Sequence, residues 1–273
     1  MEKLIVLGTG NAGVKKCYNT CFVLKNKNEY LLVDAGGGNG ILRQLDLAKI
    51  DLKKIKYMIV THGHSDHVLG TVWIFRMIAT MIKNKQYDGN FQIYCHDELV
   101  DTIKTIIKLT LQEKLYNLIG KRIFINEVKD GQSLMILGHM ITFFDIHSTK
   151  IKQFGFSIAL EDGKLTCLGD EPYHESCYQY AYKAKWLLCE AFCLDKQKDI
   201  FKPYEKHHST VKDASLIANL LEVENLLLYH SEEMNLEKRK QLYTNEAKLY
   251  FNGNIYVPDD LEIFKLWGGI LWH

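Results

Sequence analysis

The sequence has little proline, little arginine and no long apolar run. Its three prolines, Pro172, Pro203 and Pro258, all lie late in the 273 residues, so no proline-rich linker divides the chain. Only four of the 34 basic residues are arginine, which argues against a site that grips phosphates with several guanidinium groups. The net charge of +1 excludes a strongly cationic nucleic-acid binder. No segment approaches the roughly 18 apolar residues of a membrane span, so no membrane association is expected.

Disulfide and zinc-ribbon cysteine patterns are also missing. The chain has seven cysteines, an odd number, and no CxxC pair. The opening MEKLIVLGTG is too short an apolar run for a signal peptide. A reducing, cytoplasmic setting with free thiols is therefore predicted. Two close pairs, Cys17 with Cys21 and Cys189 with Cys193, are alternative soft metal ligands, although small buried thiols are more common.

What is present is an ordinary globular composition, with 47% hydrophobic and 11% aromatic residues. We expect a single domain over residues 1–273. Short apolar runs predict strands at Lys3–Leu7, Thr20–Leu24, Tyr30–Val33, Tyr57–Val60, Phe91–Tyr94, Ile123–Asn126, Ser133–Ile136, Met140–Ile146, Phe156–Leu160, Leu165–Leu168, Leu187–Cys189, Leu226–Tyr229 and Ile255–Val257. Helical spacing is found at Ile41–Leu47, Leu69–Lys83, Glu98–Leu118 and Asp213–Leu221. Strands in both halves with interspersed helices indicate an α/β fold with two packed mixed sheets and helices outside.

The strongest functional pattern follows the apolar run 57–60. His62, His64, Asp66 and His67 place three imidazoles and one carboxylate within six residues. Neutral imidazole suits Zn²⁺ and similar metals, and a carboxylate compensates charge. Four ligands from so short a loop do not reach one ion without strain. Two ions that share residues are the easier geometry, and a merely polar loop rarely concentrates three histidines around an aspartate.

Three further candidates stand at the ends of other apolar runs. His147 follows 141–146, Asp170 follows 165–169 and His230 follows 226–229. Each alone has an equally good interpretation as a buried histidine or a turn aspartate. Beside the six-residue cluster, ligands at successive strand ends on one edge of a sandwich are expected to converge on one cleft.

At this point the sequence resembles the metallo-β-lactamase superfamily, through its HxHxDH segment and the ordered downstream His, Asp and His. The resemblance covers nearly the whole chain and implies the αββα sandwich. It also implies that Asp34 is a buried supporting residue and that Asp170 bridges two metals. The implied ligands of the first metal are His62, His64 and His147, and those of the second are Asp66, His67 and His230.

Several segments resemble the ribonuclease Z-like branch in particular. They are Leu7–Gly10, Asn19–Phe22, Leu188–Phe192 and His208–Thr210. Asp170 stands where true β-lactamases of the superfamily have cysteine, which argues against antibiotic hydrolysis. The branch implies that the histidine of the HST segment is catalytic with a glutamate close to it, which here are His208 and Glu190. His207 is a rival assignment, and helix capping by Ser209 or Thr210 is the alternative interpretation of the segment.

One departure concerns RNA recognition. Ribonuclease Z enzymes usually carry a long arm between the third motif and the bridging aspartate, and that arm grips tRNA. Here only 23 positions separate His147 from Asp170. The absent arm and the small net charge favour a small phosphodiester as much as RNA.

The resulting hypothesis is a dinuclear-metal-dependent hydrolase that uses a metal-bridging hydroxide, most simply a phosphodiesterase acting on RNA, a cyclic nucleotide or a small diester. Asp66 orients the nucleophile, and Tyr173 and His174 line the substrate cleft. Two Zn²⁺ ions are expected, with Mn²⁺ or Fe²⁺ as alternatives. The alternatives in function are an ester, thioester or lactone hydrolase on the same site, and a metal-binding regulatory module without turnover. A homodimer is expected, with Trp267, Trp272 and His273 packing on the body or on the partner chain.

Overall fold

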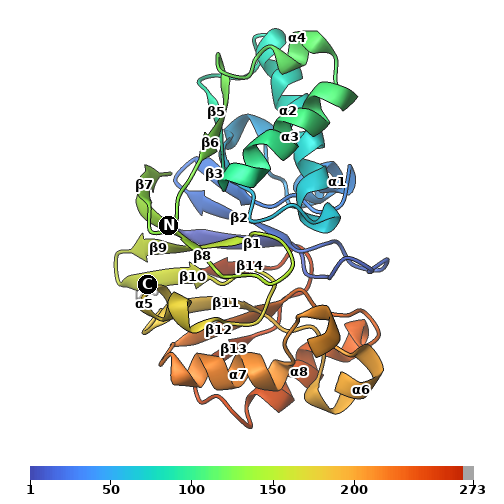
Figure 1. Cartoon of the computed structure of the whole chain (residues 1–273), viewed down its shortest axis with the longest axis vertical. Helices are drawn as coiled ribbons and strands as arrows, with labels where there is room; N and C mark the ends of the chain where they lie inside the picture. Colours follow the sequence, from blue (N-terminus) through green and yellow to red (C-terminus); the bar gives the residue numbers. More distant parts are fainter. Residues whose placement is uncertain (267–273) are drawn as a thin grey trace, which may run out of the picture.

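The computed structural model describes residues 1–266, in which two seven-stranded sheets pack face to face and helices cover both outer faces (Figure 1). The first sheet has the order β14-β1-β2-β3-β4-β5-β6. Its strands are β1 (Lys3–Gly8), β2 (Cys21–Asn26), β3 (Glu29–Val33), β4 (Ile55–Ile59), β5 (Phe91–Cys95), β6 (Ile123–Glu127) and β14 (Ile263–Lys265). The predicted αββα architecture is confirmed.

The second sheet has the order β13-β12-β11-β10-β9-β8-β7. Its strands are β7 (Ser133–Ile136), β8 (His139–Asp145), β9 (Phe154–Leu160), β10 (Gly163–Cys167), β11 (Trp186–Glu190), β12 (Asn225–Tyr229) and β13 (Asn254–Tyr256). Strands β10 to β13 run parallel, so their carboxyl ends meet at one edge of the sheet. That edge carries the residues after β10 and β12, which the sequence singled out as candidate ligands.

The helices form the outer layers. The first sheet is covered by α1 (Gly40–Leu47), α2 (Ser65–Lys83), α3 (Asp97–Thr110) and α4 (Glu113–Tyr116), and the second by α5 (Tyr178–Ala181), α6 (Lys198–Phe201), α7 (Val211–Leu220) and α8 (Arg239–Ala247) (Figure 1). Five short 3₁₀ turns complete the described elements: η1 (Leu52–Lys54), η2 (Glu175–Cys177), η3 (Asp195–Gln197), η4 (Tyr204–Lys206) and η5 (Leu236–Lys238). None of the helices in residues 1–266 combines the length and apolarity needed to cross a membrane.

Strand β1 shows how the layers are built from the sequence. Leu4 and Val6 point into the layer between the sheets, whereas Ile5 and Leu7 pack under the helices of the first sheet. Because side chains alternate along a strand, a strand covered on both faces is apolar throughout. This is why the opening run of the chain is continuous rather than alternating.

One expectation about the elements was wrong, and other elements were missed. The predicted helix Glu98–Leu118 ends at Thr110, Leu111 is extended, and the separate helix α4 follows. The Thr110 hydroxyl donates to the carbonyl of Ile106, a local bond that competes with the helix, and the break lets Leu115 turn into the core. Helix α8 and strand β14 were not predicted, because α8 has few apolar positions and β14 is only three residues long.

Candidate metal centre

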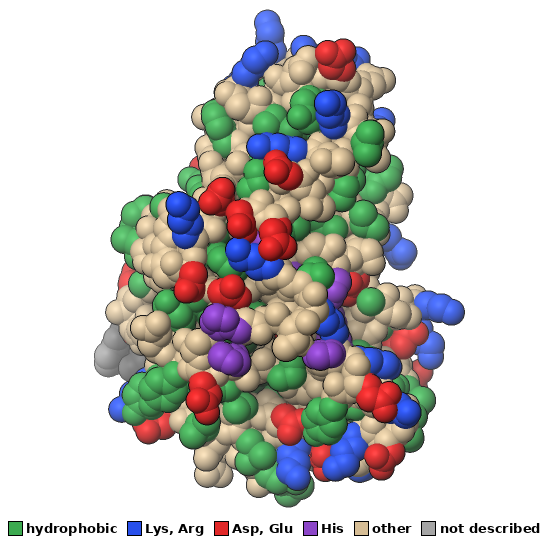
Figure 2. All heavy atoms as spheres, viewed as in Figure 1, with side chains coloured by type: hydrophobic (Ala, Val, Ile, Leu, Met, Phe, Trp, Pro, Cys, Tyr) green, Lys and Arg blue, Asp and Glu red, His purple; other side chains and the backbone are tan. Residues whose placement is uncertain are grey.

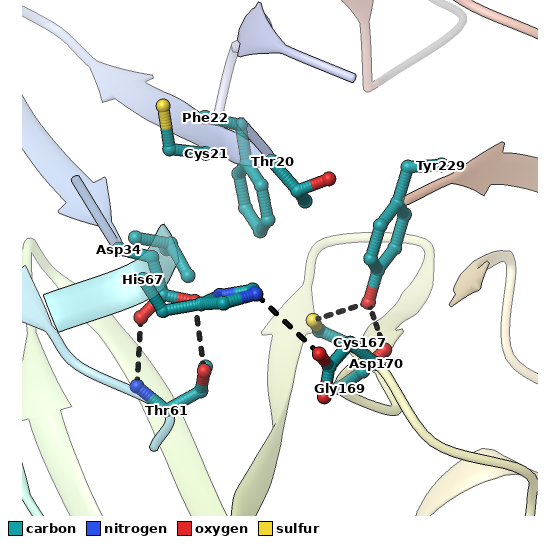
Figure 3. Close-up of a pocket in the computed structure, with 11 residues that line it drawn as sticks. Thr20, Cys21, Phe22, Asp34, Thr61, His67, Cys167, Gly169, Asp170 and Tyr229 are labelled. Atoms are coloured by element: carbon teal, nitrogen blue, oxygen red, sulfur yellow. Dashed lines mark hydrogen bonds and ion pairs between the residues drawn. The ribbon is translucent and has the colours of Figure 1, made fainter. Parts of the chain in front are cut away.

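Asp34 fixes the loop that carries the histidine cluster. It follows β3 in a left-handed conformation, with φ of 54°, and its carboxylate accepts hydrogen bonds from the backbone N–H and the hydroxyl of Thr61 at 2.8 and 2.7 Å. His67 Nδ1 donates at 2.8 Å to Asp34 Oδ2, the same oxygen that accepts the Thr61 hydroxyl (Figure 3). His67 therefore keeps Nε2 for the cluster. Asp34 lies near His62 and His67 as a possible third ligand, but its oxygens are already bonded to Thr61 and His67.

Helix α2 brings Asp66 and His67 against this loop through a close approach at Gly70. The Gly70 N–H donates to the Gly36 carbonyl at 2.8 Å, and a Cβ at Gly70 would lie 1.9 Å from the Ala35 carbonyl oxygen. Only glycine fits there. The first turn of α2 therefore starts directly beside the Asp34 loop.

Asp170 is the centre of the cluster. Its Oδ2 atom lies 3.5 Å from His62 Nε2 and 3.4 Å from the Nε2 atoms of both His67 and His230. Although burial opposes ionisation, His62 and His230 hold the pKa of the Asp170 carboxyl well below its usual range. One carboxylate oxygen thus faces three imidazoles, which come from the loop after β4, from the first turn of α2 and from the residue that follows β12.

Six of the seven predicted ligands form two sets around this carboxylate. Within each set, one potential ligating atom per residue lies within 4.8 Å of the others. The sets are His62, His64 and Asp170, and Asp66, His67 and His230. Within residues 1–266 no such set contains a cysteine. The two cysteine pairs considered as soft metal ligands, Cys17 with Cys21 and Cys189 with Cys193, are therefore not part of a candidate metal site.

The donor atoms present fit divalent cations. Asp170 Oδ1 is buried and has no hydrogen-bond partner among the described residues, which is costly unless an ion or other group binds it. His67 Nε2 and His230 Nε2 lie 3.4 Å apart in the same interior. Burial opposes a charge on His67, but Asp34 and Asp170 raise the pKa of His67 well above its usual value. A positive charge is therefore favoured at this position, and imidazole with carboxylate is a suitable donor set for zinc or manganese.

His147 differs from the expectation. It has a left-handed backbone, with φ of 56°, its N–H donates to Asp145 at 2.7 Å, and its exposed ring lies 5.0 Å from the ring of His174. It belongs to neither set of ligating atoms. The two following residues are tied to Glu171, which accepts bonds from the Ser148 hydroxyl at 2.7 Å and from the Thr149 N–H at 3.2 Å. In this structure His147 therefore lies at the rim and not beside His62 and His64.

His208 lies against the cluster, whereas His207 does not. His208 Nδ1 donates to the backbone carbonyl of Asp170 at 2.8 Å, and its ring stacks on Phe192 with 4.9 Å between centroids. Burial and the neighbouring His230 lower the pKa of His208 to about 3. His207 is exposed and contacts the Thr149 hydroxyl. Of the two adjacent histidines, His208 has the geometry of a group that can act at the site.

Glu190 lies behind His208 at the end of β11. It is fully buried, one carboxylate oxygen accepts the Ser209 N–H, and the other has no hydrogen-bond partner in the described chain. The unpartnered oxygen lies 3.8 Å from His208 Nδ1. Burial raises the pKa of Glu190 well above its usual value. The capping interpretation also holds, because Thr210 begins α7 with a reciprocal bond to Asp213.

The cluster opens into a cavity of about 460 Å³. Besides the candidate ligands and His208, its walls include residues 11–13, Lys150, Phe192 and Lys206. Figure 2 shows histidine side chains gathered around the middle of the face that it views. Sequence reasoning missed these walls, since only the fold brings residues 11–13 beside the loops at 150 and 206.

Tyr173 and His174 do not line this cavity. Tyr173 is partly buried and packs against the core of the second sheet. His174 is exposed, and its Nδ1 pairs with the Ser176 hydroxyl at 2.9 Å where η2 begins. Their closeness in sequence to Asp170 suggested a substrate role, but the chain turns away from the cavity after residue 171.

The sequence and the fold were compared with those of known proteins. The family described as anti-Pycsar protein Apyc1 matches residues 2–254. The ribonuclease Z of Thermococcus sibiricus is 26% identical, over 97% of this chain and 97% of its own length. The metallo-β-lactamase fold protein YhfI from Bacillus subtilis superposes with a TM-score of 0.79 at 19% identity, over 97% of this chain and 99% of that one. The short form of human tRNase Z gives a TM-score of 0.74 at 21% identity, over 97% and 99%. The resemblance inferred from the sequence is confirmed.

Proposed function

The chain belongs to the anti-Pycsar protein Apyc1 family, and from that premise we propose that it is a metal-dependent phosphodiesterase related to ribonuclease Z. The observation that carries the proposal is the buried carboxylate of Asp170, which faces three imidazoles at 3.4 to 3.5 Å beside an open cavity. Such a donor set suits divalent cations, and cations suit the charge of a phosphodiester.

We assign one cation to His62, His64 and Asp170 and a second to Asp66, His67 and His230, with Asp170 shared. Zn²⁺ is the default ion, because four of these six donors are imidazoles and the other two are carboxylates. His147 would complete the first set only by leaving the rim. Bound cations would lower the pKa of a coordinated water and neutralise charge on the phosphate oxygens.

His208 is the proposed proton carrier. Its Nδ1–H donates to the Asp170 carbonyl, so the nitrogen that exchanges protons with a substrate is Nε2. A neutral ring with a free Nε2 would take the proton that the attacking water loses and deliver it to the oxygen that leaves the phosphorus. Phe192 stacks on the ring and the Asp170 carbonyl accepts its Nδ1–H, so both hold the imidazole in one orientation, with Glu190 3.8 Å from Nδ1.

The cavity favours a small diester over a long RNA. Its volume of about 460 Å³ lies within the range of sites that enclose small ligands. Lys150 and Lys206 line it, and the only carboxylates among its walls are Asp66 and Asp170 of the metal sets. The two lysines therefore attract an anion to the mouth. A cyclic nucleotide or another small phosphodiester is the substrate class that we propose.

The direct test measures hydrolysis by the zinc- or manganese-loaded protein of bis(p-nitrophenyl) phosphate, a panel of 3′,5′-cyclic nucleotides, a precursor tRNA and p-nitrophenyl acetate. We expect turnover of the diesters with the highest kcat/KM for a cyclic nucleotide. Faster cleavage of the precursor tRNA would overturn the small-substrate assignment. Turnover of the acetate alone would replace the phosphodiesterase by an ester hydrolase.

Several expectations from the sequence stay predictions. They are the cytoplasmic location, the homodimer and the single domain over 1–273. Trp267, Trp272 and His273, which were expected to pack on the body or on a partner, lie outside the described residues.

A further inference from the structure

Arg239 is a buried cation far from the catalytic groups in sequence. It begins α8, and only 1% of its surface is exposed. Its Nη2 donates to the Thr9 hydroxyl at 2.7 Å and to the Pro258 carbonyl at 3.2 Å. Among the described residues Nη1 has no hydrogen-bond partner, and Nη2 is linked to the Asp260 carboxylate through the Thr9 hydroxyl. Burying a guanidinium in this way is costly, so the contacts that it does make need a reason.

Those contacts close the base of one loop. Thr9 connects Arg239 to Asp260, because the Thr9 hydroxyl donates to one Asp260 oxygen at 2.8 Å. The other Asp260 oxygen accepts the Tyr18 N–H at 2.6 Å. The Tyr18 carbonyl in turn accepts the N–H groups of Thr9 and Gly10 at 3.0 and 2.9 Å. Residues 10–19, which we call the cavity loop, therefore leave and re-enter the body at a base held by Arg239 and Asp260. Figure 1 shows this loop between β1 and β2, extending in blue from the edge of the sandwich.

The cavity loop forms a wall of the proposed substrate site. Its residues 11–13 line the cavity that opens from the metal centre. Asn11 binds the carbonyl of Ser231 through both its backbone N–H and its side-chain amide, at 3.1 and 3.3 Å. The Ser231 N–H donates back to the Thr9 carbonyl at 3.0 Å. Ser231 directly follows the candidate ligand His230, so the same base fixes the wall relative to the metal centre.

We propose that Arg239 is a positioning residue that sets the cavity loop against Ser231, so that residues 11–13 support the non-reacting part of the substrate. The kinetic part of this inference rests on the proposed phosphodiesterase function. Arg239 acts through Thr9 and touches no reacting atom. Its loss should therefore weaken substrate binding more than the chemical step.

The chain offers a matched control in Arg122. This partly buried arginine also donates to backbone carbonyls, those of Gly89 and Tyr87, at distances of 2.6 to 3.1 Å. It lies at the start of β6, among none of the cavity walls. Arg122→Met removes bonds of the same kind without touching the cavity loop.

The kinetic test compares Arg239→Met, Arg239→Lys and Thr9→Val with Arg122→Met on a cyclic nucleotide. For the Arg239 and Thr9 variants we expect KM to rise about tenfold, kcat to stay within about threefold, and metal content to be unchanged. Thr9→Val breaks the same link while Arg239 remains, so a failure of Arg239→Met to fold leaves the test intact. Equal loss of kcat and metal content at normal KM would overturn the inference in favour of a purely structural role.

A second measurement needs no activity. Lys15 and Lys16 are exposed trypsin sites on the cavity loop. If the base is held by Arg239, cleavage after these lysines in the folded protein should be several-fold faster in Arg239→Met and Thr9→Val than in the wild type or Arg122→Met. Cleavage at the wild-type rate would contradict the inference. If the wild type hydrolyses no diester, the proposed function fails and this measurement alone decides the role of Arg239.

Discussion

At the scale of single residues, the site depends on which ring nitrogen of each histidine is not already used in a hydrogen bond to the protein. Asp34 holds His67 through Nδ1, and the Asp170 carbonyl holds His208 through the same ring atom. In both cases Nε2 is the nitrogen that is left for a cation or a substrate. Sequence spacing identified these residues, but it contains no information on which nitrogen is used.

The adjacent histidines give the sharpest prediction at this scale. His208→Ala should lower kcat by about 10²-fold or more while the metal content stays that of the wild type, because we assign the ring to proton transfer. Potential ligating atoms of His208, Glu190 and His230 also lie within 4.8 Å of one another, but neither of the two assigned metal sets includes His208. His207→Ala is the matched control, since its ring is exposed and contacts Thr149. Activity that fell with His207→Ala and not with His208→Ala would reverse the assignment. Metal loss in His208→Ala would make it a ligand.

At the scale of elements, strand ends explain why much of the site was predictable. Apolar runs mark where β4, β10 and β12 end, and the polar residue just past each run lies at the converging edge. Asp170 and His230 follow this rule. His147 does not, because its N–H bonds Asp145 and the next two residues bond Glu171, and its exposed ring lies at the rim beside His174. Such side-chain contacts depend on segments far apart in sequence and leave no local pattern.

The residues that line the cavity were also not predictable from local sequence patterns. Phe192 and Lys206 belong to segments that the sequence marked only for their catalytic neighbours. Arg239 stands out in the sequence only as one of four arginines. Its position beside Thr9 arises because α8 packs against β13 and the Arg239 side chain reaches Thr9 and Pro258, long-range contacts that no spacing predicts.

The capping box of α7 supports a prediction about one element. Thr210 caps the helix that follows His208, and Asp213 returns the bond to the Thr210 N–H at 2.9 Å. Thr210→Ala should lower the free energy of unfolding by about 1 kcal/mol. Urea denaturation of the metal-loaded protein measures this change. An unchanged midpoint would mean that the box does not stabilise the helix. A control with Ser176→Ala, at the short turn η2, should change stability less.

At the scale of the whole molecule, metal binding and folding should be coupled. The centre joins β4 and α2 of the first half to β10 and β12 of the second, so cations that bind only the folded chain stabilise the sandwich across both sheets. Removal of metal with a chelator should lower Tm by several degrees and abolish diester hydrolysis, and added Zn²⁺ or Mn²⁺ should restore both. If the chelator changed neither Tm nor diester hydrolysis, the claim that cations bind at this centre would be contradicted.

The central claim is that Asp170 organises a metal centre that hydrolyses phosphodiesters. Elemental analysis combined with kcat for Asp170→Asn tests it most directly, with Asp199→Asn as an exposed carboxylate control. We predict about two divalent cations per chain in the wild type and the control. In Asp170→Asn at least one cation should be lost, and kcat should fall by about 10³-fold. Full metal content and full activity in Asp170→Asn would contradict the claim.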